Sequence, residues 1–198
     1  MNKIDRGAVL VEQLDFYWNA HFRPRLEGLR DDEYLWEPVE GCWRVRQRPD
    51  GTHAMDGMSP APSRPPLTTV AWRMMHIGVE CFVTRASTFF GDGTVPDDAD
   101  MFDPRHVPSD LPGTAARAVS FLDDAYAWWH GGVAGLDEED LTEPLGHKGG
   151  GLADSSMAEL IAHINREVMH HGGEIGVLRD LYRVAWTAPS SGRPGLRE

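Results

Sequence analysis

Four long segments carry apolar residues at every third or fourth position, and stretches rich in proline, glycine and aspartate separate them. Such spacing gathers the apolar side chains on one face of an α-helix. The segments cover residues 8–29, residues 68–90, the stretch from LPGT as far as Val133, and the stretch from DSSMAEL to about Ala185. Helices of roughly 20 to 30 residues, each with an apolar face, can bury those faces against one another. The chain is therefore predicted to be all-α and to form a four-helix bundle.

Local residues predict where these helices begin and where they are disturbed. The prolines and threonines of SRPPLTT favour a helix start near Thr68, and GDG after residue 90 ends that helix. Ser156 lies three residues before Glu159, the spacing of a capping box. Pro24 has no backbone N–H, so we expect it to kink the first helix or to free one carbonyl group.

The connection over residues 36–66 is too long for a plain turn. Within it, CWRVRQRPDGTHAM alternates around an Asp-Gly pair, which predicts a long loop or a short hairpin inserted between the first two helices. The last segment, TAPSSGRPGLRE, is typical of a flexible and solvated tail. The predicted organisation is one domain over residues 1–186 and a flexible tail over residues 187–198.

Two helix-end segments are similar to each other. GLRDDEYLWEP follows the first helix and GLDEEDLTEP follows the third, and both run from Gly-Leu through acidic residues to Glu-Pro. One interpretation is that two related helix pairs pack about a pseudo-twofold axis. The other is that both segments are ordinary acidic turns.

Composition limits the classes of partner. A formal net charge of −12 argues against a nucleic-acid or anionic-membrane partner and fits a protein that binds a small-molecule substrate. No run approaches the roughly 18 apolar residues of a membrane span, and the start MNKIDRGAVL lacks the apolar stretch of a signal peptide. Cys42 and Cys81 have neither metal-type spacing nor a disulfide framework, so a cytoplasmic location is expected, with Cys81 in the core.

Residues 163–182 read HINREVMHHGGEIGVLRDLY and concentrate histidine and glutamate on one helix. Because an α-helix turns by about 100° per residue, His163, Glu167, His171 and Glu174 fall within an arc of about 80°. Glu167 and His171 form an E-x-x-x-H pair, whose spacing lets two side chains hold one ion. An exposed histidine-rich helix would show the same letters.

Burial strengthens the metal interpretation. The same segment carries apolar residues that a bundle would turn inward, and the His/Glu arc borders them: Leu160, Ile161, Ile164, Val168, Ile175, Leu178 and Leu181. A carboxylate and an imidazole at such a border are costly unless they are paired or bound to metal. Gly172 and Gly173 are poor helix formers, and close approach by a neighbouring helix or a ligand would explain them.

A third ligand should come from another helix. His76 lies in VAWRMMHIGVECFV on the second helix, with Trp72 and Glu80 one turn away. A histidine in such an apolar run is usually a hydrogen-bonded core residue. Facing a Glu/His pair in the same bundle, it becomes a candidate ligand.

WRMMHIGVE together with NREVMHHGGEIGVLRDLY resembles the DinB/YfiT-like four-helix-bundle superfamily, and the likeness extends to the Leu-Trp-Glu-Pro turn after the first helix. The resemblance implies one metal ligand on the second helix and two on the fourth, which correspond here to His76, Glu167 and His171. Glu167 in place of a histidine is similar to the branch of mycothiol-dependent maleylpyruvate isomerases and mycothiol S-transferases. His163 matches a histidine often seen in related sequences.

The resemblance further implies a divalent metal and a low-molecular-weight thiol as co-substrate. For two imidazoles and one carboxylate, Zn²⁺ is the first choice, and Ni²⁺, Fe²⁺ or Mn²⁺ also fit. The predicted function is a thiol-dependent S-transferase or isomerase acting on a small electrophile. A homodimer is common in this superfamily, although no apolar stripe here predicts one.

Three other functions stay open. The same ion could hydrolyse a substrate with water. A non-catalytic, stress-linked bundle would bury its ion with no cavity beside it. The donor set also occurs in non-haem iron oxygenases, but those usually have β-barrel scaffolds.

The remaining histidines also have alternatives. His170 could pair with His163, whereas the other five are expected to be solvated: His21, His53, His106, His130 and His147. Glu80 or Glu174 could orient a ligand imidazole or could form an ordinary surface salt bridge.

Overall fold

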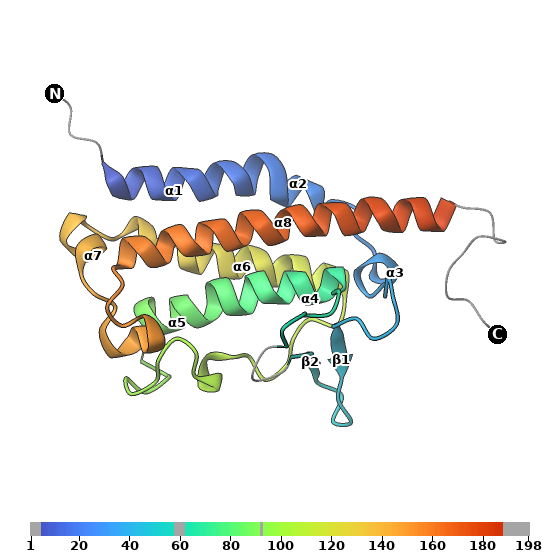
Figure 1. Ribbon diagram of the computed structural model, residues 1–198, viewed down its shortest axis with the longest axis horizontal. Coiled ribbons are helices and arrows are strands. Elements are labelled where there is room, and N and C mark those ends of the chain that lie inside the picture. The colour runs from blue at the N-terminus through green and yellow to red at the C-terminus, as the bar shows by residue number, and fades with distance from the viewer. Residues whose placement is uncertain (1–4, 58–61, 92, 188–198) are drawn as a thin grey trace.

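The computed structural model describes residues 5–57, 62–91 and 93–187, and within them four long helical runs lie side by side (Figure 1). The first run consists of α1 (Arg6–Tyr17), the π-helical segment η1 (Trp18–Phe22) and α2 (Arg23–Arg25). The second consists of α4 (Val70–Met75), the π-helical segment η2 (His76–Val83) and α5 (Thr84–Phe90). The third is α6 (Ala115–Ala134) and the fourth is α8 (Met157–Thr187). The predicted all-α bundle is confirmed.

The runs pack in a closed cycle. Both α6 and α8 contact the first run and also the second, so the apolar face of each helix meets two neighbours. Gly78 in η2 allows a close approach by α6, since a Cβ atom there would lie 2.6 Å from the ring of Phe121. The tryptophans on three runs, Trp18, Trp72 and Trp129, are all buried.

The predicted helix starts are confirmed by their caps. Thr69 precedes α4 and its hydroxyl accepts a hydrogen bond from the backbone N–H of Trp72 at 3.1 Å. At the start of α8, the N–H of Ser156 donates to the Glu159 carboxylate at 2.7 Å and the N–H of Glu159 donates to the Ser156 hydroxyl at 3.3 Å. These are the two reciprocal bonds of a capping box.

The first run differs from its prediction at its end. It widens into the π-helical turn η1 just before Pro24 and ends at Arg25 instead of residue 29. The chain then turns through Gly28, whose φ of +66° favours glycine. Leu26 is buried at the helix end, and Leu29 lies in the following loop.

The insertion between the first two runs contains the predicted hairpin. Strands β1 (Val45–Gln47) and β2 (His53–Met55) pair antiparallel, with Val45 opposite Met55. Gly51 of the Asp-Gly pair has φ +88°, as the turn requires. The hairpin projects beside the end of the bundle that carries α3 (Figure 1).

The two similar acidic segments both contain a short helix, α3 (Asp31–Tyr34) and α7 (Glu138–Thr142). The acidic residues at their first turns fit the positive end of a helix dipole. The likeness is therefore at least local, and a pseudo-twofold relation between the helix pairs stays a prediction. Two 3-10 segments, η3 (Pro104–His106) and η4 (Gly146–Leu152), lie in the longer connections.

One predicted core residue is wrong. Leu181 is half exposed, because it shares the outward face of α8 with the exposed Val177 and Val184. The other six apolar residues predicted to face inward on α8 are buried. Cys42 and Cys81 are buried free cysteines, and the prediction that Cys81 lies in the core is confirmed.

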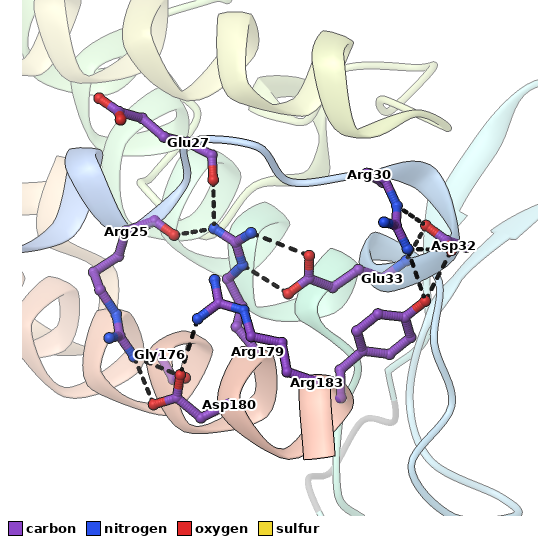
Figure 2. A network of polar contacts seen from close by, with 10 residues as sticks. Arg25, Glu27, Arg30, Asp32, Glu33, Gly176, Arg179, Asp180 and Arg183 are labelled. Carbon is purple, nitrogen blue, oxygen red and sulfur yellow. Dashed lines mark hydrogen bonds and ion pairs between the residues drawn. The ribbon is translucent and has the colours of Figure 1, made fainter. Parts of the chain in front are cut away.

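The C-terminal half of α8 is held by a buried ion pair (Figure 2). Arg179 donates from Nε and Nη2 to the two carboxylate oxygens of Glu33 in α3, at 2.8 and 3.1 Å. Its Nη1 donates to the backbone carbonyls of Arg25 and Glu27 after the first run. Both side chains of the pair are almost fully buried.

Exposed pairs surround this buried one. Arg25 bonds to Asp180 at 2.9 Å, Arg30 bonds to Asp32 at 2.8 Å, and the hydroxyl of Tyr182 donates to Asp32 at 2.8 Å. The contacts of Asp180 and Tyr182 tie α8 to α2 and α3 (Figure 2).

None of the helices in the described ranges combines the length and the apolar character that crossing a bilayer requires. The predicted tail lies outside the described residues, apart from Thr187 at the end of α8.

Candidate metal centre

Three predicted ligand side chains converge between the second and fourth runs. His76 begins η2, and Glu167 and His171 lie one turn apart on α8. Each offers one ligand atom, and these atoms all lie within 4.8 Å of one another. The nearer carboxylate oxygen of Glu167 is 3.1 Å from Nε2 of His171 and 3.8 Å from Nε2 of His76. Donor atoms at these separations can share an ion whose bonds are about 2 Å long.

The far side of each imidazole ring is held by another carboxylate. Nδ1 of His76 lies 2.5 Å from Glu80, and Nδ1 of His171 lies 2.6 Å from Glu174. In metal sites, such a carboxylate fixes the ring orientation and makes the imidazole a better ligand. Both glutamates that the sequence offered for this role lie in position for it, although Glu80 and Glu174 also remain partly exposed.

The ligand atoms of His76, Glu167 and His171 are better suited to bind a cation than to pair with one another. When Glu80 and Glu174 accept the Nδ1 protons, both Nε2 atoms carry lone pairs that face the Glu167 carboxylate. Nδ1 of His171 also lies 3.0 Å from Nη1 of Arg73. Burial lowers the pKa of His171, which favours the neutral ring that metals bind. Nε2 of His76 is buried without a hydrogen-bond partner among the described residues. A divalent ion would bond to the Glu167 carboxylate and to both Nε2 atoms, including the orphaned one of His76.

Packing makes the first ligand rigid. The Trp72 ring stacks on the His76 ring, with centroids 5.3 Å apart and planes 8° apart. The indole N–H of Trp72 donates to the carbonyl of Asp56, just after the hairpin, at 2.7 Å, so the insertion supports the site. Arg73 lies 3.0 Å from Glu174 and 5.3 Å above the Trp72 ring. Sequence reasoning missed Arg73, although its place three residues before His76 was a usable signal.

A cavity of about 300 Å³ opens beside the converging side chains. One part of its wall carries His76, Glu80 and Glu167, and His163 also borders it. The rest of the wall comprises Cys81, Thr84, Arg85, Met101, Phe102, Val107 and Ile164. The space matches the low end of the range for small-molecule sites.

The competing histidines occupy other positions. His163 contacts Glu167 at 3.8 Å, and the exposed His170 contacts Glu174 at 3.4 Å. Over the described residues, His170 groups with His171 and Glu174 and not with His163. The alternative pairing of His163 with His170 is therefore not formed in this structure.

The expectation of solvated histidines is wrong for His106. It is 6% exposed, with Nδ1 2.8 Å from the Ser87 hydroxyl and Nε2 3.1 Å from the Thr88 hydroxyl. The connection between α5 and α6 folds against α5 and carries His106 inward. His21 and His147 are exposed, and His53 and His130 are half-buried beside aspartates. None of these five joins a group of converging ligands within the described ranges.

Close approach explains one glycine of the pair on α8. A Cβ atom on Gly172 would lie 2.4 Å from the hydroxyl of Tyr17, which itself donates to the carbonyl of Met169 at 3.1 Å. Gly173 has open space around it, so the same explanation is wrong there.

Comparison with known proteins supplies the family. A family model described as the DinB superfamily matches residues 13–175. Searches of curated proteins and of solved structures gave no significant match. The matched range contains the converging side chains and most of the four helical runs. The chain therefore belongs to the DinB superfamily.

Proposed function

We propose that the chain is a divalent-metal-dependent enzyme that uses a low-molecular-weight thiol. It either joins the thiol to a small electrophile, as an S-transferase, or isomerises the electrophile. The observation that carries this proposal is the convergence of two imidazoles and one carboxylate beside a cavity of about 300 Å³. Three protein ligands leave coordination positions open, which is the pattern of a catalytic ion.

His76, Glu167 and His171 would hold the ion, with Zn²⁺ as the first choice and Ni²⁺, Fe²⁺ or Mn²⁺ as alternatives. A bound divalent ion lowers the pKa of a thiol or water that reaches it, so that the nucleophile ionises near neutral pH. Glu80 and Glu174 keep both rings oriented through their Nδ1 contacts.

The cavity wall supports an external thiol. The only thiol on that wall is Cys81, which is 2% exposed, and burial raises its pKa. A buried thiol of raised pKa is a poor nucleophile. A nucleophilic sulfur would therefore come from a co-substrate, whereas apolar side chains such as Met101 and Ile164 shield the carbon that it attacks from water.

The test is thiol consumption by metal-loaded protein. Untagged protein is loaded with Zn²⁺, Ni²⁺, Fe²⁺ or Mn²⁺ and mixed with mycothiol or bacillithiol and a set of small electrophiles, and the remaining thiol is measured. We expect metal-dependent loss of thiol that the His171→Ala protein does not catalyse and the His147→Ala protein does, because His147 is exposed and remote from the cluster. Absence of turnover with every thiol and metal would contradict the proposal.

Hydrolysis is the alternative that the same donor set could perform. Chelator-sensitive cleavage of esters or amides without any thiol would favour it. A non-catalytic bundle would have no cavity beside the cluster, so the cavity counts against that function.

A further inference from the structure

A second charged group lies in the cavity wall. Arg85 belongs to α5 and follows His76 by nine residues on the second run. The residue is only 9% exposed. Arginine is rarely buried unless a carboxylate or another anion pairs with it.

Among the described residues, only neutral groups accept hydrogen bonds from this guanidinium. Nη1 donates to the hydroxyl of Thr84 at 2.8 Å and to the carbonyl of Met101 at 2.9 Å. The Phe102 ring lies 4.8 Å from the central carbon. Nε is buried and makes no hydrogen bond within the part of the chain that the structure describes. The buried Nε–H therefore lacks an acceptor among the described residues.

The nearest carboxylates act only at a distance. Burial lowers the pKa of Arg85, while Glu80 and Asp100 act in the opposite direction through charge, without a hydrogen bond. Arg179 shows what a completed buried arginine looks like, because Glu33 accepts from both its Nε and its Nη2. Arg85 has the same fork of donors, but no carboxylate among the described residues accepts a hydrogen bond from it.

We propose that the cavity binds a small molecule with a carboxylate group, which accepts hydrogen bonds from Arg85 while the rest of the molecule faces His76 and Glu167. A planar carboxylate fits the guanidinium fork and satisfies the buried Nε. A cavity of about 300 Å³ restricts the ligand to a small molecule. The inference deepens the proposed function and rests on it for the role of the ligand, because the carboxylate can belong either to the thiol or to the electrophile.

The binding test uses two thiols of equal size, 3-mercaptopropionate and 3-mercaptopropionamide. Isothermal titration of zinc-loaded and of metal-free protein should give at least about tenfold tighter binding of the acid in both forms, because the guanidinium pairs with the carboxylate and not with the amide. Arg85→Met keeps an unbranched apolar stem without the guanidinium and should remove the preference. Arg117→Met is the matched control, since Arg117 is exposed on α6 and pairs with Asp110. Equal affinities of the wild-type protein for acid and amide would overturn the inference, as would a preference that survives in a folded Arg85→Met protein.

A spectroscopic measurement does not depend on that variant folding. In protein labelled with ¹⁵N-arginine, the acid should shift the Nε–H signal of Arg85, assigned with Arg85→Lys, whereas the amide should not. Unchanged Arg85 signals at saturating acid would also overturn the inference.

Turnover separates the two sources of the carboxylate and the two proposals. With mycothiol as the thiol, iodoacetate and iodoacetamide are compared as electrophiles; with iodoacetamide as the electrophile, 3-mercaptopropionate and its amide are compared as thiols. A preference for iodoacetate places the carboxylate on the electrophile, and a preference for the thiol acid places it on the thiol. Discrimination by Arg85 in binding without any thiol turnover would leave the anion site standing and refute the proposed function. Thiol turnover at equal rates with the acid and the amide of both pairs, together with equal binding affinities for acid and amide, would support the proposed function and refute the anion site.

Discussion

Two polar clusters lie along α8, and the protein completes only one of them. Near the end of the helix, Arg179 meets Glu33 through two hydrogen bonds and two backbone carbonyls accept its remaining donors. About two to three turns earlier, His171 and Glu167 meet His76, and the buried Nε2 of His76 has no hydrogen-bond partner among the described residues.

The difference separates structure from function. Both clusters take charged or polar groups out of water, which is costly unless each group finds a partner. The Arg179 cluster balances donors with acceptors, so it stabilises the bundle and needs no ligand. In the His76 cluster, the Arg73 guanidinium contacts Glu174 and Nδ1 of His171, while both Nε2 atoms converge on the Glu167 carboxylate. That inner face of the cluster is therefore suited to bind a cation.

The largest expected effect breaks the His76 cluster. His171→Ala removes one of three ligands and should weaken divalent-metal binding on the order of a thousandfold, with little change in the helical content of the protein. Chelator competition followed by elemental analysis measures the affinity. His147→Ala, which alters an exposed histidine, should keep wild-type metal content; equal loss in both proteins would show that the ligand assignment is wrong.

The second effect breaks the Arg179 cluster. Arg179→Ala leaves Glu33 as a buried charge without its partner and should lower the free energy of unfolding by about 3–5 kcal/mol. Urea denaturation of the metal-free proteins measures this change. The double variant Arg179→Met with Glu33→Leu should recover much of the loss, because no buried charge remains. An Arg179→Ala protein as stable as wild type would contradict the structural role.

A smaller effect sharpens the comparison within the candidate metal centre. Glu80→Gln or Glu174→Gln should lower metal affinity by roughly 10–100-fold, since each carboxylate holds the Nδ1 side of a ligand ring. The stability of the metal-free protein should change little, because both glutamates are partly exposed. Affinities equal to wild type in both variants would mean that these contacts are surface salt bridges without influence on the ion.

The smallest effect concerns His106, a buried group with neutral partners only. Burial lowers its pKa in the folded protein below the unfolded value of about 6.5, so stability is complete above that pH and falls as the pH drops through the folded pKa. Relative to His106→Gln, wild type should lose unfolding free energy between pH 7.5 and pH 5. Denaturation series at the two pH values test this. A wild-type protein that gains stability toward pH 5, relative to the variant, would show that the sign is wrong.

The helical bundle could be predicted from the sequence because it follows from local signals. Apolar spacing predicted the helical runs, and Ser156 with Glu159 predicted the start of α8. The convergence of Glu167 with His171 follows from their spacing on one helix. His76 required a resemblance in addition, because nothing local shows which face of the second run meets α8.

What the sequence did not reveal depends on distant contacts. Glu33 and Arg179 are 146 positions apart, so their pairing exists only once α3 packs against α8. His106 becomes buried because the connection after α5 folds back onto that helix. Arg85 resembles any charged residue near a helix end until the cavity beside it is known.

The central claim is that His76, Glu167 and His171 share one divalent ion. The most direct measurement is a crystal structure of the metal-loaded protein, with anomalous diffraction at the edge of the loaded metal. The account predicts one ion per chain, bound by two imidazole nitrogens and a carboxylate oxygen at about 2.0–2.2 Å. An ion held by other residues, or no anomalous peak between these three side chains at saturating metal, would contradict it.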